Sequence, residues 1–244
     1  MAARGGLAMH ELAPGVYALG QREGGRVHAF LLDDGEALTL VDTLYDTDGA
    51  RVLAALEAMG RPRDAVRHIV ITHGHRSHLG GGAVLKEATG ADVYAHDWER
   101  DVIQGERKAQ PVTLVPKRPF QAYFPLQLGL ALGLGKHPPF RVDHEIAAGD
   151  RIGPLHVIDA SGHTPGHLAL WWPERRVLLS GDAIATWPEF AAGWPAFNLN
   201  LKQHRASLRR MAELDAEVVG VGHGEPIRRD GARRVRTLVD QLDR

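Results

Sequence analysis

A short run of histidines constrains this chain more than any other feature. Residues 72–81 read Thr-His-Gly-His-Arg-Ser-His-Leu-Gly-Gly, which places histidines at His73, His75 and His78. The largely apolar run 66–71 before it predicts a β-strand, and the run 83–88 after it predicts a helix. Histidine is the commonest metal ligand in proteins, and a dense cluster at the end of a strand can begin a zinc site. The run therefore predicts a metal site at a strand end.

The composition excludes several classes of protein. The chain has 244 residues, a formal net charge of −1 and no cysteine. The balanced charge demands neither a nucleic-acid nor a membrane partner, and the lack of cysteine rules out disulfides and thiolate ligands. The N-terminus lacks the apolar core of a signal peptide, and no run approaches the roughly 18 apolar residues of a membrane helix. We therefore expect a cytoplasmic protein.

Short apolar runs alternate with amphipathic stretches along the chain, which is typical of an α/β fold. The predicted strands lie at residues 16–19, 27–32, 37–41, 68–71, 93–95, 156–158, 168–172, 177–179 and 217–221. Further helices are predicted up to residue 59 and over 97–104, 202–214 and 229–242. Residues 105–142 contain six prolines and predict an insertion or cap. This segment could be a lid or binding loop, or a disordered segment or one that contacts another subunit.

Five of these strand-like runs end in residues that can bind metal. The run 37–41 leads into Asp42, and the run 68–71 leads into the histidine cluster. The runs 156–158, 177–179 and 217–221 lead into His163, Asp182 and His223, respectively. If the strand ends meet at one edge, these side chains meet too. Neighbouring glycines allow the tight turns and close backbone approach that such an edge needs.

The order and local form of these motifs resemble the metallo-β-lactamase superfamily, from Asp42 to His223. The resemblance implies a four-layer αβ/βα sandwich, with two mixed β-sheets flanked by helices, in one domain over residues 1–244. It also implies the ligands of two metals: His73, His75 and His163 for the first, Asp182 as a bridge, and His78 and His223 for the second. Asp42 would steady the histidine loop, and His167 would support the site without binding metal.

Ser77 departs from the pattern of this superfamily, which has aspartate at this place in its H-x-H-x-D-H motif. Serine is neutral and a poor zinc ligand, so the second site should be weakened more than the first. Three outcomes remain open: a mononuclear enzyme, a looser second metal, or a site completed by another group. The candidates for that group are His96, Asp97, Asp143 and His144. Ser77 could also be a helix N-cap.

The resemblance implies a metal-dependent hydrolase that uses metal-bound hydroxide on a small ester, thioester, lactone or amide, in a lactonase-like manner. One or two zinc ions are expected, and Asp182 would orient the water and accept its proton. The alternative is an iron persulfide dioxygenase with His73, His163 and Asp182 as ligands. The expected partner is a small-molecule substrate without nucleic acid or membrane, and a homodimer is possible.

Aromatic residues near the motifs could line a substrate pocket. Trp187 and Trp194 follow Asp182 closely, and Tyr123 lies in the insertion. Packing within loops explains them about equally well. The histidines outside the motifs are expected to be surface or ordinary strand residues: His10, His28, His68, His137, His156 and His204.

Overall fold

Two β-sheets form the centre of the protein in this computed structural model, which describes residues 9–109, 124–125, 127–129, 132 and 135–242. The first sheet has seven strands in spatial order β1 (His10–Ala13), β2 (Val16–Gln21), β3 (Val27–Asp33), β4 (Leu38–Val41), β5 (Val66–Val70), β6 (Asp92–Ala95) and β7 (His144–Glu145). The second has five, in the order β12 (Val218–Gly220), β11 (Val177–Leu179), β10 (Leu168–Trp172), β9 (Leu155–Asp159) and β8 (Arg151–Ile152).

Both sheets are mixed, as the resemblance implies. Strands β1 to β4 pair antiparallel, whereas β4 to β7 run parallel. In the second sheet β8 to β11 are antiparallel, and β12 runs parallel to β11. The helices are α1 (Glu23–Arg26), α2 (Ala50–Ala58), α3 (Arg76–Leu79), α4 (Gly82–Thr89), α5 (Asp97–Ile103), α7 (Leu201–Ala212) and α8 (Gly231–Leu242), with 3-10 turns at Arg63–Ala65, Pro173–Arg175 and Gly181–Ala183.

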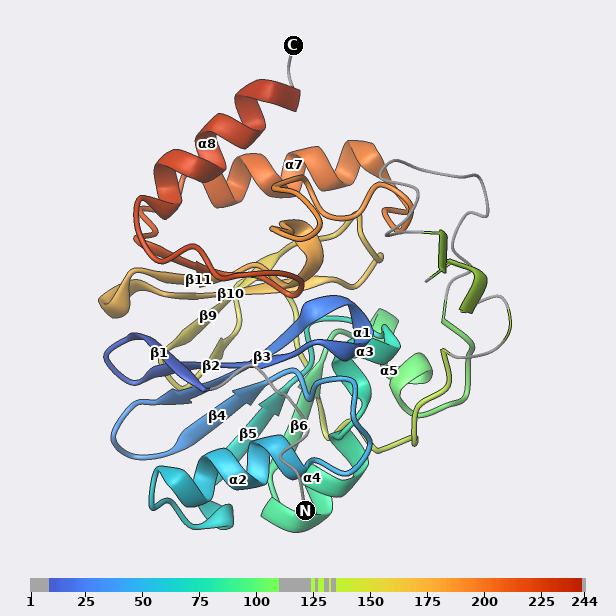
Figure 1. Ribbon diagram of the computed structural model, residues 1–244, viewed down its shortest axis with the longest axis vertical. Helices are drawn as coiled ribbons and strands as arrows, with labels where there is room; N and C mark the ends of the chain where they lie inside the picture. Colours follow the sequence, from blue (N-terminus) through green and yellow to red (C-terminus); the bar gives the residue numbers. More distant parts are fainter. Residues whose placement is uncertain (1–8, 110–123, 126, 130–131, 133–134, 243–244) are drawn as a thin grey trace.

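The layers follow from the alternation of side chains along the strands. In β10, Leu168 and Leu170 pack between the two sheets, whereas Ala169 packs on the opposite face with residues of α7 and α8. Helices α2 and α4 cover the outer face of the first sheet through residues such as Leu56 and Leu85. The resulting order, helices–sheet–sheet–helices, is visible in Figure 1 and confirms the predicted four-layer sandwich.

The structure adds short elements that the sequence patterns did not predict. These are β1, β7, β8 and the one-turn helices α1 and α3. Much of the predicted insertion, residues 110–123, 126, 130–131 and 133–134, lies outside the described residues. Its end is anchored, because Phe140 and Val142 are buried against the core of the first sheet. Among the helices of the described ranges, none is long and apolar enough to cross a membrane.

Candidate metal centre

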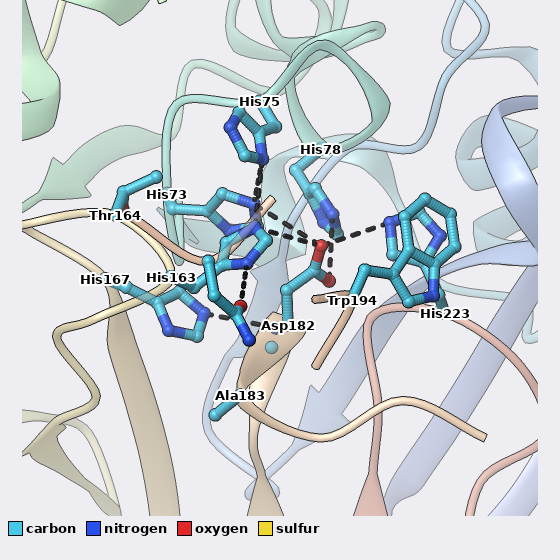
Figure 2. A network of polar contacts seen from close by, with 12 residues as sticks. His73, His75, His78, His163, Thr164, His167, Asp182, Ala183, Trp194 and His223 are labelled. Carbon is cyan, nitrogen blue, oxygen red and sulfur yellow. Dashed lines mark hydrogen bonds and ion pairs between the residues drawn. The ribbon is translucent and has the colours of Figure 1, made fainter. Parts of the chain in front are cut away.

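The predicted ligands meet at one edge of the sandwich, around the carboxylate of Asp182 (Figure 2). His73 and His75 come from the loop after β5, and His163 from the loop after β9. The Nδ1 atom of His75 lies 3.1 Å from Nε2 of His73 and 3.0 Å from Nε2 of His163. Asp182 Oδ2 lies 3.7 Å from Nε2 of His73 and 3.4 Å from Nε2 of His163. These four residues form a first ligand group.

A second ligand group shares Asp182. His78 of α3 places Nε2 at 3.3 Å from Asp182 Oδ1, and His223, after β12, places Nε2 at 3.2 Å from Asp182 Oδ2. His73, His78, His163 and His223 are all buried, and Asp182 is 4% exposed. The aspartate therefore stands between two sets of imidazoles, as a bridging ligand requires.

The donor atoms fit metal ions. Tetrahedral zinc holds nitrogen at about 2.0–2.1 Å, which separates neighbouring donors by about 3.3 Å. The donor separations in the first group, 3.0 to 3.7 Å, surround that value. In the second group, His78 Nε2 and Asp182 Oδ1 are buried and lack a hydrogen-bond partner among the described residues, although they face each other. Buried polar atoms without partners are costly, and a cation between them removes that cost.

Four of the five histidines are fixed through Nδ1, which leaves Nε2 directed at the centre. His163 Nδ1 lies 3.0 Å from Asn198 Oδ1, His223 Nδ1 lies 2.9 Å from the Gly25 carbonyl, and His73 Nδ1 lies 3.0 Å from Thr72 Oγ1. His78 Nδ1 lies 2.8 Å from Asp42 Oδ2. Each of these partners accepts the Nδ1 proton. Metal-binding histidines commonly have such partners, which set the tautomer and the ring orientation.

Asp42 ties the two ends of the histidine loop together. It follows β4 in the left-handed backbone region, with φ of 60°, which aspartate tolerates better than most residues. Its carboxylate accepts the Thr72 backbone N–H at 2.9 Å and the Thr72 hydroxyl at 2.9 Å, besides the bond from His78. The hydroxyl in turn holds His73. Asp42 thus contacts one histidine of the second group directly and one of the first through Thr72.

His167 supports Asp182 from behind. Its Nε2 accepts the backbone N–H of Asp182 at 3.1 Å, and its Nδ1 donates to the Ala160 carbonyl at 3.0 Å. Gly222 is needed on the other side, because a Cβ there would lie 1.9 Å from Asp182 Oδ1. A glycine is therefore required for the close approach of the Asp182 carboxylate.

The two ligand groups differ in the protonation of their histidines. Burial lowers the pKa of His75 to about 4 and that of His163 to about 3, and it lowers the pKa of His73 well below its usual value. Burial also opposes the charge of His78, but the carboxylates of Asp182 and Asp42 outweigh it and raise the pKa to about 10. The first group therefore offers neutral imidazoles, whereas His78 carries a proton that a metal must displace.

Ser77 is not the N-cap that the sequence suggested. It lies inside α3, whose N-cap is His75, and α4 begins after Gly81. Its side chain is partly exposed, and its hydroxyl makes no hydrogen bond to any residue in the described part of the chain. Within those residues, nothing in the chain holds this hydroxyl in place.

None of the proposed substitutes for the missing aspartate joins either ligand group of the described chain. His96 caps α5 by accepting the Trp98 N–H, and Asp97 pairs with Arg100. Asp143 is bound to Lys86 and the Val93 N–H, and His144 pairs with Asp92. The second group thus consists of two histidines and the shared aspartate.

Glu99, a buried carboxylate in α5, was not among the site residues predicted from the sequence. One of its oxygens accepts bonds from the Thr164 hydroxyl at 2.6 Å and the Gly166 N–H at 3.0 Å, and the other accepts from the Gly74 N–H at 2.9 Å. Glu99 therefore joins the loop of His73 and His75 to the loop of His163. A lone glutamate in a polar helix carries no sequence signal for this role.

Two histidines outside the motifs are buried near the centre. His28 is a strand residue, as expected, whereas the buried helical residue His204 is contrary to our expectation of a surface or ordinary strand residue. His204 in α7 contacts the Ala183 carbonyl through Nε2 at 3.0 Å. His28 in β3 is 4% exposed, and burial, with a smaller contribution from the neighbouring His223, lowers its pKa to about 4. Both residues belong to the packing behind the ligands.

The aromatic residues occupy different places. Trp194 stacks on His223 with ring centres 4.1 Å apart, and its Nε1 donates to the Trp187 carbonyl at 2.7 Å. Tyr123 lies outside the described residues. A small hollow lies instead on the His75 side, with Trp98 and Glu99 in its wall.

Comparison with known proteins agrees with the fold. The sequence model of the metallo-beta-lactamase superfamily matches residues 22–223, and the chain belongs to this superfamily. The resemblance predicted from the histidine motif is thus confirmed. Membership in this superfamily, together with the clustered histidines, supports a metal-binding enzyme of the hydrolase type.

The relatives are distant. The chain is 24% identical over 217 residues to the uncharacterized protein YobT of Bacillus subtilis, which covers 85% of this chain and 87% of the relative. It is 30% identical over 192 residues to a hydroxyacylglutathione hydrolase of Rhodobacter capsulatus, covering 76% of this chain but 59% of the relative. A metallo-beta-lactamase family protein from Thermus thermophilus superimposes with a TM-score of 0.66 at 27% identity, covering 95% of this chain and 79% of that one.

Proposed function

We propose that the protein is a zinc-dependent hydrolase of small esters, thioesters, lactones or amides. The observation that carries the proposal is the first ligand group, in which three neutral imidazole nitrogens and one carboxylate lie at the separations of a zinc site. Zinc bound there supplies an activated water at neutral pH and polarises the carbonyl under attack. A thioester substrate gains support from the hydroxyacylglutathione hydrolase relative.

The residues of the chain have separate roles in this proposal. His73, His75 and His163 hold the first metal, and Asp182 holds it together with any second metal at His78 and His223. Asp182 also orients the attacking water and accepts its proton. Asp42, His167 and Glu99 keep the ligands in place through the bonds described above.

The second candidate is a mononuclear iron dioxygenase that acts on persulfides. The missing aspartate at Ser77 favours it, because a weak second site leaves a mononuclear centre. Two histidines and one carboxylate, here His73, His163 and Asp182, are the ligand set of many such enzymes. However, His75 directs a third nitrogen at the same point, and a set of three histidines favours zinc.

Metal analysis of untagged protein, purified without added metal, separates these candidates. We expect one to two zinc ions per chain and hydrolysis of a panel of aryl esters, thioesters and lactones that stops on chelation and returns with zinc. One iron per chain, with oxygen uptake on a persulfide and no hydrolysis, would establish the dioxygenase instead. A folded protein that holds neither metal would refute both.

A further inference from the structure

The imidazole of His223, in the second ligand group, is held by two residues that are distant from it in the sequence. Trp194 stacks on its face, with ring centres 4.1 Å apart and 28° between the planes (Figure 2). The Gly25 carbonyl accepts its Nδ1 proton at 2.9 Å. A face contact and an edge contact therefore fix the ring while its Nε2 atom lies 3.2 Å from Asp182 Oδ2.

The indole of Trp194 is itself fixed by its surroundings. Its Nε1 donates to the Trp187 carbonyl at 2.7 Å, and the residue is 5% exposed. Its ring centre lies 5.6 Å from that of Trp187 and 5.4 Å from that of Phe197. Ordering a free side chain on binding costs free energy, so an imidazole that is already held against a fixed indole binds a metal at a lower entropic cost.

Gly25 permits both contacts because it has no side chain. Its φ of 91° lies in the left-handed region that glycine adopts readily. A Cβ atom at this position would lie 2.5 Å from Cη2 of Trp194 and 3.3 Å from Nδ1 of His223. Any larger residue would therefore displace one of the two stacked rings.

The stack also favours the metal-bound form of His223 by electrostatics. A metal at Nε2 draws electron density from the imidazole and makes the ring more positive. The face of an indole carries negative charge and attracts positive groups more strongly than the other aromatic side chains do. Phe197 approaches His75 of the first group at 6.3 Å and 76°, a longer contact without this overlap of faces. The indole should therefore favour the second metal over the first.

We propose that Trp194 and Gly25 are positioning residues of the second metal site. Their contacts with His223 raise the affinity of this site and partly offset the carboxylate that is missing at Ser77. The inference rests on the metal binding of the proposed function, whereas it does not depend on hydrolysis. Both residues act through His223 and neither binds the metal.

Zinc titration of the full chain against a chromophoric chelator, without substrate, measures the affinities of the two sites. For Trp194→Leu we expect the affinity of the second site to fall about tenfold, because the stack is lost. The affinity of the first site should stay within about twofold. Trp194→Phe should recover part of the loss, since a phenyl ring can still stack. Trp171→Leu, at a partly buried position of β10, is the control and should alter neither site.

Two glycine variants test the edge contact while Trp194 is kept. Gly25→Ala should lower the affinity of the second site about tenfold, because the new Cβ displaces the rings. Gly35→Ala is the matched control: Gly35 has a similar φ of 96°, but nothing lies within 4 Å of its Cβ position. Both variants carry the same backbone strain, so a loss for Gly25→Ala alone isolates the contact with the two rings.

Tryptophan emission during the same titration gives a spectroscopic readout. We expect the emission of the wild type to change mainly with the second equivalent of zinc, because Trp194 contacts His223. The change should disappear in Trp194→Phe and persist in Trp171→Phe. A purely structural role of Trp194 would not produce this dependence on the second metal.

Three results would overturn the inference. They are an equal loss at both sites in Trp194→Leu, equal zinc affinities in the two glycine variants, and wild-type emission that does not respond to a second zinc. A wild-type protein that binds a single zinc would overturn it as well. If the expected metal effects are found but no ester, thioester, lactone or amide is cleaved, the proposed hydrolysis fails and the role of Trp194 and Gly25 stands.

Discussion

The two ligand groups that share Asp182 differ in how readily they accept a metal. The first group has three histidines whose pKa values lie below the neutral range, so they present lone pairs without losing a proton. The second has two histidines, and one of them, His78, has a pKa raised to about 10. The superfamily motif has an aspartate at the position of Ser77, and that aspartate would add a carboxylate to the second group. Because a metal must displace the proton of His78 at neutral pH, we expect the second metal to bind more weakly.

The largest effect expected from this difference concerns one histidine of each group. His163→Ala should remove the first metal and lower kcat/KM by about 10³-fold or more, because the Lewis acid supplies several kcal/mol. His223→Ala should leave the first metal in place and lower kcat/KM about tenfold. Metal content by plasma mass spectrometry and ester hydrolysis measure both effects. Equal losses in the two variants would show that the groups act as one unit.

A smaller effect is expected from the carboxylate that holds His78. Asp42→Asn replaces one acceptor oxygen by an amide N–H₂, which cannot accept the Nδ1 proton of His78. We expect the affinity for the second metal to fall about 10- to 100-fold, with a smaller loss at the first. Competition with a chromophoric chelator measures both affinities. Asp240→Asn on the exposed face of α8 is the control. An equal loss of metal affinity at both sites would contradict the expectation that Asp42 supports the second site more than the first.

The buried histidine His28, which packs behind His223 of the second group, predicts a stability that depends on pH. The backbone N–H of His28 donates to the Gly222 carbonyl at 2.9 Å, next to His223. The folded-state pKa of His28, about 4, lies below the unfolded value of 6.5. Its contribution to stability is therefore complete above about pH 6.5 and is lost as the pH falls towards 4.

At about pH 5 we expect His28 to lower the free energy of unfolding by about 2 kcal/mol relative to neutral pH. His28→Gln should remove this dependence, whereas His156→Gln on β9 should keep it. Urea denaturation at the two pH values measures the difference in the free energy of unfolding between each variant and the wild type. An unchanged pH dependence in His28→Gln would show that this histidine is already protonated in the folded protein.

The sequence predicted the convergence of the ligands because each ligand follows a strand. Asp42, His73, His163, Asp182 and His223 all lie just after apolar runs, and such runs are the strongest secondary-structure signal in a single sequence. The apolar pattern alone predicts an α/β fold, and the two mixed sheets were implied by the resemblance to the superfamily. Short edge strands such as β7 and β8, with two residues each, fall below the length at which alternation can be recognised.

The residues that hold the ligands were harder to predict. Glu99 and Asn198 act through side-chain hydrogen bonds to loops far away in the chain, and neither residue belongs to a motif. Ser77 was misplaced as a possible N-cap because the sequence suggested one helix, whereas the chain forms α3, capped by His75, and then α4. Such contacts depend on tertiary packing, which local patterns do not encode.

The smallest expected effect concerns Ser77 itself. Ser77→Asp restores a carboxylate in α3, one residue before His78, and so tests whether the position still faces the second group. We expect the affinity for the second metal to rise about tenfold, as one added anionic interaction of about 1.4 kcal/mol implies. The affinity for the first metal should stay within about twofold. Ser77→Asn is the matched control, because it has the same shape without the charge. If the aspartate and asparagine variants bind the second metal equally, the loop directs this side chain to solvent, and the weakness of the second group must then come from the proton of His78 alone.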